Sequence, residues 1–195
     1  MNDFSLPPPD LDFSTAKPPA MEFAFRIRIF FKERVRLAPT TPLGGRVYVP
    51  PAAGDIVGPR LQGRVVPYSG ADYARGRADG VGELNAHYML EASDGTPIYI
   101  NNRGFLYARD ANGKPLPQAG NEPSQFGAGA GAGPGAGPAN PTRFATSPNL
   151  YFVCIPAFDA PTGPHDWLTR HVFLCRGVRK SPPDHTVFDY FVVTG

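Results

Sequence analysis

The feature that most constrains the fold is the segment 82–103, "GELNAHYMLEASDGTPIYINNR", in which polar and apolar residues alternate around Asp94-Gly95. Alternation with a period of two is typical of a half-buried β-strand, and Asp-Gly between two such segments is a strong signal for a β-hairpin. The segment therefore predicts two antiparallel strands. The first would carry two distinct faces, one with Glu83, Asn85, His87 and Met89 and the other with Leu84, Ala86, Tyr88 and Leu90.

Similar alternation recurs along the chain. "EFAFRIRIFF" places Phe23, Phe25, Ile27 and Ile29 on one face, and "LYFVCIPAF", "HVFLCRGVRK" and "TVFDYFVV" read as further strands. A sustained period of 3.6 is absent from the sequence, and only "PHDWLT" resembles a helical turn. Many short strands separated by turns favour a sandwich or a closed barrel. We predict an all-β fold with little helix, an antiparallel β-barrel of about eight strands, because closure removes exposed sheet edges.

The chain's 195 residues fit a single β domain, which we place at residues 21–195. Residues 1–20 contain "PPPD" and "KPP" and predict an extended proline-rich arm. Residues 110–149 include "QFGAGAGAGPGAGPANP", which has too few large apolar side chains to join a core. We interpret that stretch as a flexible Gly/Ala/Pro-rich insertion within the domain.

Composition and motifs exclude several function classes. A net charge of +2, with only 18% charged residues, lacks the concentrated basic patch of a nucleic-acid-binding protein. Cys154 and Cys175 form neither a disulfide framework nor a metal-ligand motif. No nucleotide-binding glycine motif, secretory signal or bilayer-spanning apolar run is present. We therefore expect a cytoplasmic protein with reduced thiols, no metal, no cofactor, and no membrane or nucleic-acid partner.

Three blocks in order resemble a known family. They are "GGRVYVPPAAGDIVGPRLQGRVVPYSGADY", with Gly-Pro-Arg-Leu and Gly-Ala-Asp motifs, then "ADGVGELNAHYMLEASDGTPIYINNRG", and then "YFVCIPAFDAP" with "DWLTRHVFLCRG". Together they are similar to the domain of unknown function 3237 family, also called uncharacterised protein family 0311, over roughly residues 22–107 and 150–193. The chain departs from the family pattern at Asn85, His87, Val153 and Asp159. The resemblance implies an antiparallel barrel with a central cavity, and some fungal relatives resemble isomerases or cyclases of the chalcone-isomerase type.

The orientation of the polar rows decides how this resemblance applies. The segment 55–67, "DIVGPRLQGRVVP", reads as a strand with Arg60, Gln62 and Arg64 on one face and Leu61 and Val65 on the other. Alternate residues of a barrel strand face the lumen, but parity alone does not say which row does so. The polar rows either line a binding cavity or form a solvated outer surface. Charges facing inward would require partners or a ligand, because an unpaired buried charge is costly.

On the first alternative, the chain is a cofactor-independent isomerase or cyclase acting on a small aromatic metabolite, for example converting a chalcone to a flavanone by intramolecular oxa-Michael addition. Arginine can hold a phenolate or enolate, and histidine can move a proton near neutral pH. The candidate catalytic residues are Arg60, His87, Asn85 and Tyr88. The candidate substrate-binding residues are Gln62, Asn101, Arg103, Asp159, Trp167, Tyr99 and Phe105.

Two other functions remain open from the sequence. A non-catalytic carrier would hold an unchanged ligand in an apolar lumen. A structural or interaction protein would use the proline-rich arm and a barrel face. A homodimer is a further expectation, because an exposed apolar face at Phe23–Ile29 would need to be covered.

Overall fold

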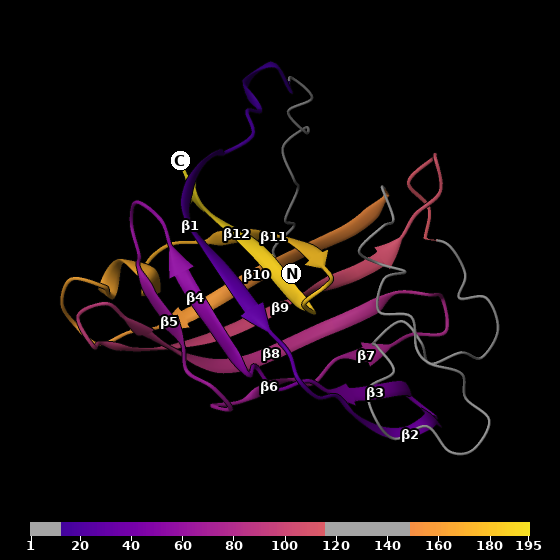
Figure 1. Ribbon diagram of the computed structural model, residues 1–195. Coiled ribbons are helices and arrows are strands. Elements are labelled where there is room, and N and C mark those ends of the chain that lie inside the picture. The colour runs from indigo at the N-terminus through magenta and orange to yellow at the C-terminus, as the bar shows by residue number, and fades with distance from the viewer. Residues whose placement is uncertain (1–12, 116–148) are drawn as a thin grey trace, which may run out of the picture.

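The computed structural model describes residues 13–115 and 149–195, which form one strongly curved sheet (Figure 1). Residues 1–12 of the predicted arm and 116–148 of the predicted insertion lie outside the described residues. The short helices are η1 (Phe13–Thr15) and η3 (Asp166–Thr169). The strands are β1 (Ala20–Phe30), β2 (Val35–Thr41), β3 (Gly44–Tyr48), β4 (Ala53–Val57), β5 (Gly63–Val65), β6 (Ala71–Asp72), β7 (Arg75–Gly76), β8 (Gly82–Ala92), β9 (Pro97–Ala108), β10 (Leu150–Asp159), β11 (Phe173–Lys180) and β12 (His185–Thr194).

Eight of these strands close into an antiparallel barrel, as the sequence predicts. The ring runs β8-β5-β4-β1-β12-β11-β10-β9, and the pairing of β9 with β8 closes it. The hairpin predicted around Asp94-Gly95 is confirmed as β8 and β9, with Tyr88 opposite Ile100. The single helical turn predicted at "PHDWLT" is confirmed as η3.

The remaining four strands form an extension that is attached to one half of β8. The last residues of β8 pair with β5, whereas its first residues pair with β6 and β7. Strands β3 and β2 continue from β7, and they lie beside the ring at the bottom of Figure 1. We call β2, β3, β6 and β7 the side flap.

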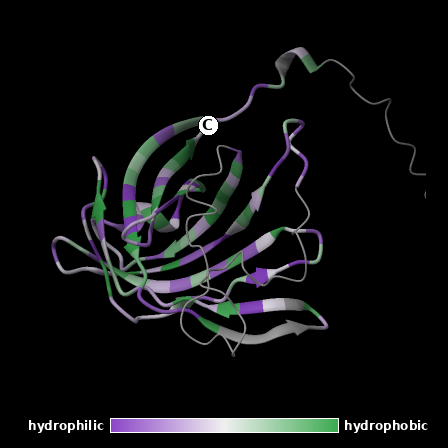
Figure 2. Cartoon of the chain, turned by 45° about the vertical axis from the view of Figure 1, so that its right-hand side comes forward, coloured by the Kyte–Doolittle hydropathy of each residue, from purple (hydrophilic) through white to green (hydrophobic). Residues whose placement is uncertain are grey.

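Polar and apolar residues alternate along the strands, as the purple and green bands in Figure 2 show, and the burial of the side chains alternates with them. Phe25, Ile27 and Ile29 of β1 are buried, while Arg26 and Arg28 between them are exposed. The predicted apolar face of this strand therefore lines the barrel, and the expectation that it forms an exposed dimer surface is wrong for these three residues. A register shift between Phe23 and Phe25 leaves Phe23 outside.

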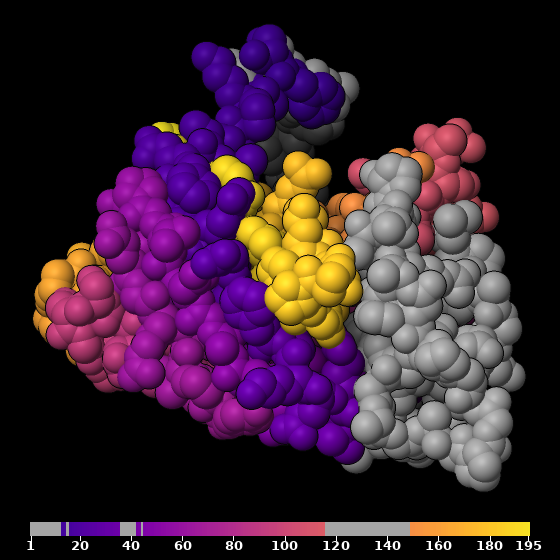
Figure 3. Space-filling view, viewed as in Figure 1, coloured from indigo at the N-terminus to yellow at the C-terminus, as the bar shows by residue number. Residues whose placement is uncertain are grey.

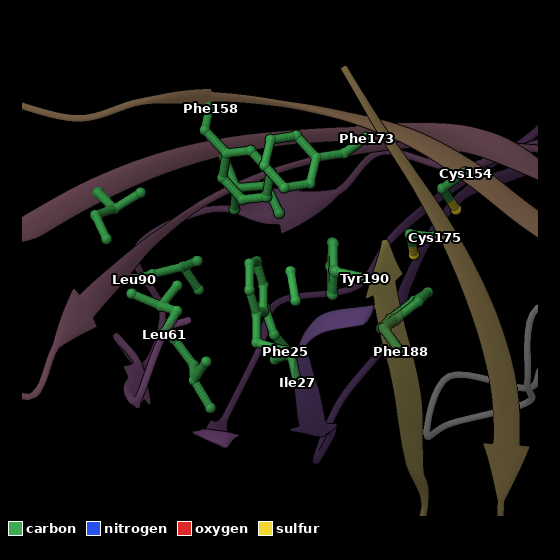
Figure 4. Packing of buried hydrophobic residues seen from close by; sticks show 14 of the residues in the cluster. Phe25, Ile27, Leu61, Leu90, Cys154, Phe158, Phe173, Cys175, Phe188 and Tyr190 are labelled. Atoms are coloured by element: carbon green, nitrogen blue, oxygen red, sulfur yellow. The ribbon is translucent and has the colours of Figure 1, made fainter. Parts of the chain in front are cut away.

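Aromatic rings fill the interior toward the η3 end of the barrel (Figure 4). Phe25 stacks on Tyr190 with ring centroids 4.8 Å apart, and Phe158 meets Phe173 edge-on at 5.1 Å. Leu168 of η3 is buried in the same cluster, and Trp167 packs against it. Such pairs add about 0.5–1.5 kcal/mol each beyond the burial of their surface.

The segment 13–19, which precedes β1, projects from the barrel and is seen in indigo at the top of Figure 3. No helix in the described ranges has the length and apolar character needed to cross a bilayer.

Candidate active site in the barrel interior

The predicted strand through Arg60 is interrupted, and its polar row faces outward. Residues 58–62 form a bend and loop between β4 and β5, so only Gly63–Val65 is a strand. Leu61 and Val65 are buried, whereas Arg60, Gln62 and Arg64 are exposed. The alternative in which these three residues line the lumen is therefore wrong.

The outward rows pair with each other across neighbouring strands. Arg64 Nε donates to Glu91 Oε1 at 2.8 Å, and these two residues are directly opposite on β5 and β8. Arg26 contacts Asp189 in the same way on β1 and β12. Opposite charges facing each other on a sheet stabilise the pairing modestly, so these arginines have a structural explanation that needs no ligand.

Arg60 covers one end of the barrel. Its guanidinium lies 3.9 Å from the centroid of the Trp167 ring, and its backbone N–H donates to the carbonyl of Ala24. Arginine over the face of tryptophan is a favourable cation–π arrangement. The structure therefore brings together two of the predicted site residues, but as an outer cover over the core.

His87, Asn85 and Tyr99 also come together, on the outer side of β8 and β9. His87 Nε2 lies 2.8 Å from Asn85 Oδ1, and His87 Nδ1 contacts the Tyr99 hydroxyl. Asn101 is directly opposite His87 on β9. Among the other predicted substrate-binding residues, Arg103, Phe105 and Asp159 are exposed. The row that contains His87 therefore does not face the lumen.

Tyr88 is the predicted catalytic residue that points into the barrel. Its side chain is buried with four other polar or sulfur-bearing side chains of the interior, Asn102, Cys154, Cys175 and Tyr190. We call these five residues the polar layer. They come from five consecutive strands of the ring, β8, β9, β10, β11 and β12.

Pairing across the strands explains how the polar layer assembles. Cys154 is opposite Cys175, and Cys175 is opposite Tyr190, so their side chains point to the same side of the sheet. Figure 4 shows the two sulfur atoms beside each other. Asn102 of β9 lies opposite Ala86 of β8. Ala86 is two residues from Tyr88 and shares the lumen side of β8 with it, so Asn102 is a neighbour of Tyr88. Gly104, opposite Cys154, leaves room for the sulfur, because a Cβ there would lie 2.6 Å from Sγ.

Two polar atoms of the layer have no hydrogen-bond partner in the described part of the chain. They are the Tyr88 hydroxyl and Asn102 Oδ1, while Asn102 Nδ2 donates weakly to the Tyr190 hydroxyl at 3.5 Å. A buried polar group without a partner costs about 1–3 kcal/mol. Native proteins rarely leave such groups unpaired, and ordered water is their usual partner where no protein atom is in reach.

Burial also sets the ionisation of the layer. It is the main cause that raises the pKa values of Tyr88, Tyr190 and Cys175 well above their usual range. Both phenols and the Cys175 thiol therefore keep their protons at neutral pH. Tyr88 can donate a hydrogen bond to a ligand, but it does not act as a phenolate.

Asp72 adds an ionisable group at the edge of this layer. It lies on β6 directly opposite Ala86, so its side chain points to the lumen side of the sheet. Its Oδ1 accepts a hydrogen bond from the backbone N–H of Asn85 at 2.9 Å. Removal of the carboxyl from solvent raises the pKa of Asp72 to about 7, although the Asn85 bond opposes this shift. Burial raises the pKa of Tyr88 most; the neighbouring Tyr190 hydroxyl lowers it, and the two thiols and the Asp72 charge raise it further.

Sequence reasoning missed Asp72 and Asn102 as candidate site residues. Asp72 belongs to the Gly-Ala-Asp motif, which was noted only for its resemblance. Asn102 interrupts the apolar row Ile98, Ile100, Leu106, and a polar residue in an inward row is the signal that would have identified it. Over residues 13–115 and 149–195, no group of three His, Cys, Asp or Glu side chains converges as metal ligands.

A family model described as a protein of unknown function (DUF3237) matches residues 19–193. The chain belongs to this family. A UPF0311 protein of Clostridium acetobutylicum is 24% identical over 94% of the chain and 100% of the relative.

Solved structures share the fold. A protein of unknown function from Clostridium acetobutylicum superimposes with a TM-score of 0.69 and 25% identity, covering 91% of this chain and 99% of that one. An enzyme from Penicillium herquei gives a TM-score of 0.58 at 17% identity, covering 91% of this chain and 96% of that one. The second likeness extends to the fold alone.

Proposed function

We propose that the protein is a cofactor-independent isomerase or cyclase that acts on a small aromatic molecule bound in the barrel. The observation that carries this proposal is the pairing of a carboxyl group whose pKa is about 7 with an interior layer that has unpaired polar atoms. A general acid–base catalyst works best when its pKa lies near the working pH. Strongly shifted groups beside one another on the inside of a fold are typical of functional sites.

Asp72 and Tyr88 would have complementary roles in the closure of a hydroxylated chalcone. The Asp72 carboxylate accepts the phenol proton, and the phenolate oxygen forms a C–O bond to the β-carbon of the enone. The electron pair of the broken C=C π bond moves to the carbonyl oxygen, where the Tyr88 O–H donates to the developing enolate. Asp72 then returns its proton to the α-carbon, so the product is an isomer and no co-reactant is consumed.

The interior supports the binding of an aromatic substrate. Phe25 and Phe158 pack against Tyr190 of the polar layer, so a substrate ring that enters between these side chains would meet aromatic faces. Holding the chalcone in the folded conformer, with the phenol oxygen beside the β-carbon, would fix its internal rotations before ring closure and so lower the entropic part of the barrier. The Penicillium herquei neighbour is called an enzyme, which supports catalysis on this fold but gives no reaction.

The test is turnover of a panel of hydroxychalcones by the wild type and matched variants, followed by chiral chromatography of the flavanone. Asp72→Asn and Tyr88→Phe change the interior, whereas His87→Ala and Arg60→Ala change the outer rows. We expect Asp72→Asn to lower kcat about 10²–10⁴-fold and the outer variants to retain activity. Wild-type rates in both interior variants would refute the assigned roles.

A carrier function is the second candidate, and the largely apolar interior favours it. A carrier would bind the same chalcones without changing their mass or chromatographic mobility. Binding that depends on Tyr88 but gives no product after prolonged incubation would support the carrier and overturn the isomerase.

A further inference from the structure

A second charged cluster lies at the other end of the barrel from η3, where β1 ends and the turn between β11 and β12 approaches it. It consists of Arg34, Arg179 and Asp184, and we call it the end cluster. Arg179 and Arg34 each contact one oxygen of the Asp184 carboxylate. The backbone N–H of Phe31 donates to the Asp184 carbonyl at 3.2 Å, which ties the two segments together.

The end cluster is mostly buried and has an excess of positive charge. The Arg34, Arg179 and Asp184 side chains are only 12%, 15% and 18% exposed, unlike the outer Arg64, at 58%. Two guanidinium groups and one carboxylate leave a net charge of +1 among these described residues. A buried excess charge is unfavourable unless a counter-charge is bound, so the cluster attracts an anion.

The arginines are held in place by neighbours that do not neutralise them. Arg179 Nη1 donates to Thr186 Oγ1 at 2.8 Å. The Phe31 ring centroid lies 5.3 Å from the Arg179 guanidinium carbon and 5.5 Å from that of Arg34. Burial is the main cause that lowers the pKa of Arg179 to about 10; the Asp184 charge opposes this shift and the Arg34 charge adds to it, so Arg179 remains cationic at neutral pH.

Within the cluster, Arg179 lies on the lumen side of the ring. Arg179 is directly opposite Thr186, and Thr186 is opposite the buried Ile29, so all three side chains point to the same face. Tyr190 lies four residues further along β12, which corresponds to about 13 Å along a strand. The inward row of β12 therefore runs from Thr186, beside Arg179, past the buried Phe188 to Tyr190 of the polar layer.

We propose that Arg34 and Arg179 bind the carboxylate of a small aromatic ligand at this end of the barrel. The inference rests on the proposed function and narrows its substrate class to aromatic carboxylates. A monovalent carboxylate balances the excess charge of +1, whereas a phosphate dianion would replace it with an excess of −1. Arginine forks match a planar carboxylate well, and fixed arginines lose little entropy on binding.

The test compares 4-hydroxycinnamate with its uncharged amide, 4-hydroxycinnamamide, and with acetate, by calorimetry and thermal shift at constant ionic strength. The wild type should bind the acid at least tenfold more tightly than the amide, and acetate weakly. Arg34→Gln and Arg179→Met should reduce affinity for the acid about ten- to a hundredfold while leaving the amide unchanged. Arg64→Gln removes an exposed arginine and serves as the control.

Asp184→Asn should change the affinity for the acid in the direction opposite to the arginine variants. It removes the competing carboxylate and should tighten binding of the acid several-fold, whereas a purely structural cluster would show only lower stability. Equal affinity for acid and amide in the wild type, or weaker acid binding in Asp184→Asn, would overturn the inference. If Arg179→Met does not fold, Arg34→Gln and Asp184→Asn decide the result.

The two proposals fail separately. Equal affinity of the wild type for acid and amide, or weaker acid binding in Asp184→Asn, with chalcone turnover still dependent on Asp72, removes the carboxylate site only. Acid preference that survives in Asp72→Asn, with no chalcone converted by the wild type, supports the carboxylate site and removes the isomerase.

Discussion

Replacing Asp72 by Asn should make the protein more stable at alkaline pH while removing its activity. The amide has nearly the same shape and keeps an oxygen that can accept the Asn85 N–H bond. The change therefore removes the ionisable proton and little else. The expected effect comes from the pKa of Asp72, which burial raises from 3.8 to about 7.

The sign follows from proton binding in the two states. Between about pH 4 and pH 7 the unfolded carboxyl is ionised, whereas the folded one keeps its proton, so wild-type stability falls as pH rises through this window. A shift of roughly 3 units at about 1.36 kcal/mol each sets an upper value of about 4 kcal/mol. Asp72 as a whole is only partly buried, so about 2–4 kcal/mol is the expected range.

The assay is urea unfolding of both proteins from pH 4.5 to pH 8. The free energy of unfolding of Asp72→Asn, minus that of the wild type, should increase with pH and level off above pH 7. Asp55→Asn is the matched control with the opposite sign, because the bond from Arg28 lowers the pKa of Asp55. A difference that stays flat for Asp72→Asn would refute the burial of this carboxyl.

Three further predictions follow from the interior and the outer rows. Tyr88→Phe removes a hydroxyl without a partner, so it should leave stability unchanged or raise it by up to about 1–3 kcal/mol in denaturant unfolding, while ligand binding is lost. Gly177→Ala places a Cβ 2.7 Å from the Phe152 ring and should cost about 1–3 kcal/mol, and Phe152→Leu in the same chain should restore part of it. Arg60→Ala should cost about 0.5–1 kcal/mol through loss of its tryptophan contact, and neither it nor His87→Ala should change chalcone turnover.

The fold could be predicted because its signals are local. The Asp94-Gly95 turn and the alternating residues on both sides of it define β8 and β9 without knowledge of the rest of the chain. Closure followed from the number of strands and the need to remove sheet edges. The interruption at residues 58–62 was missed because alternation continues through the loop, where Leu61 is still buried.

The site was harder to predict because alternation defines two faces but not which one is inside. Arg64 and His87 looked like a cavity wall until register placed Glu91 opposite one and Asn101 opposite the other. Polar rows that pair with each other across strands do not need a lumen, and such pairing is invisible before register is known. The polar layer depends on side chains from five strands that are distant in the sequence, so no single motif contains it.

The division of β8 between two sets of partners has a consequence for how such a protein can diversify. Tyr88 and Asn102 belong to strands of the closed ring, whereas Asp72 belongs to β6, a two-residue strand of the side flap. Substitutions or length changes in the side flap can therefore shift the carboxyl of Asp72, the proposed acid–base group, while the ring stays unchanged. The same eight-strand barrel could in this way accept ligands whose reactive atoms lie at different depths, without changes in the barrel strands themselves.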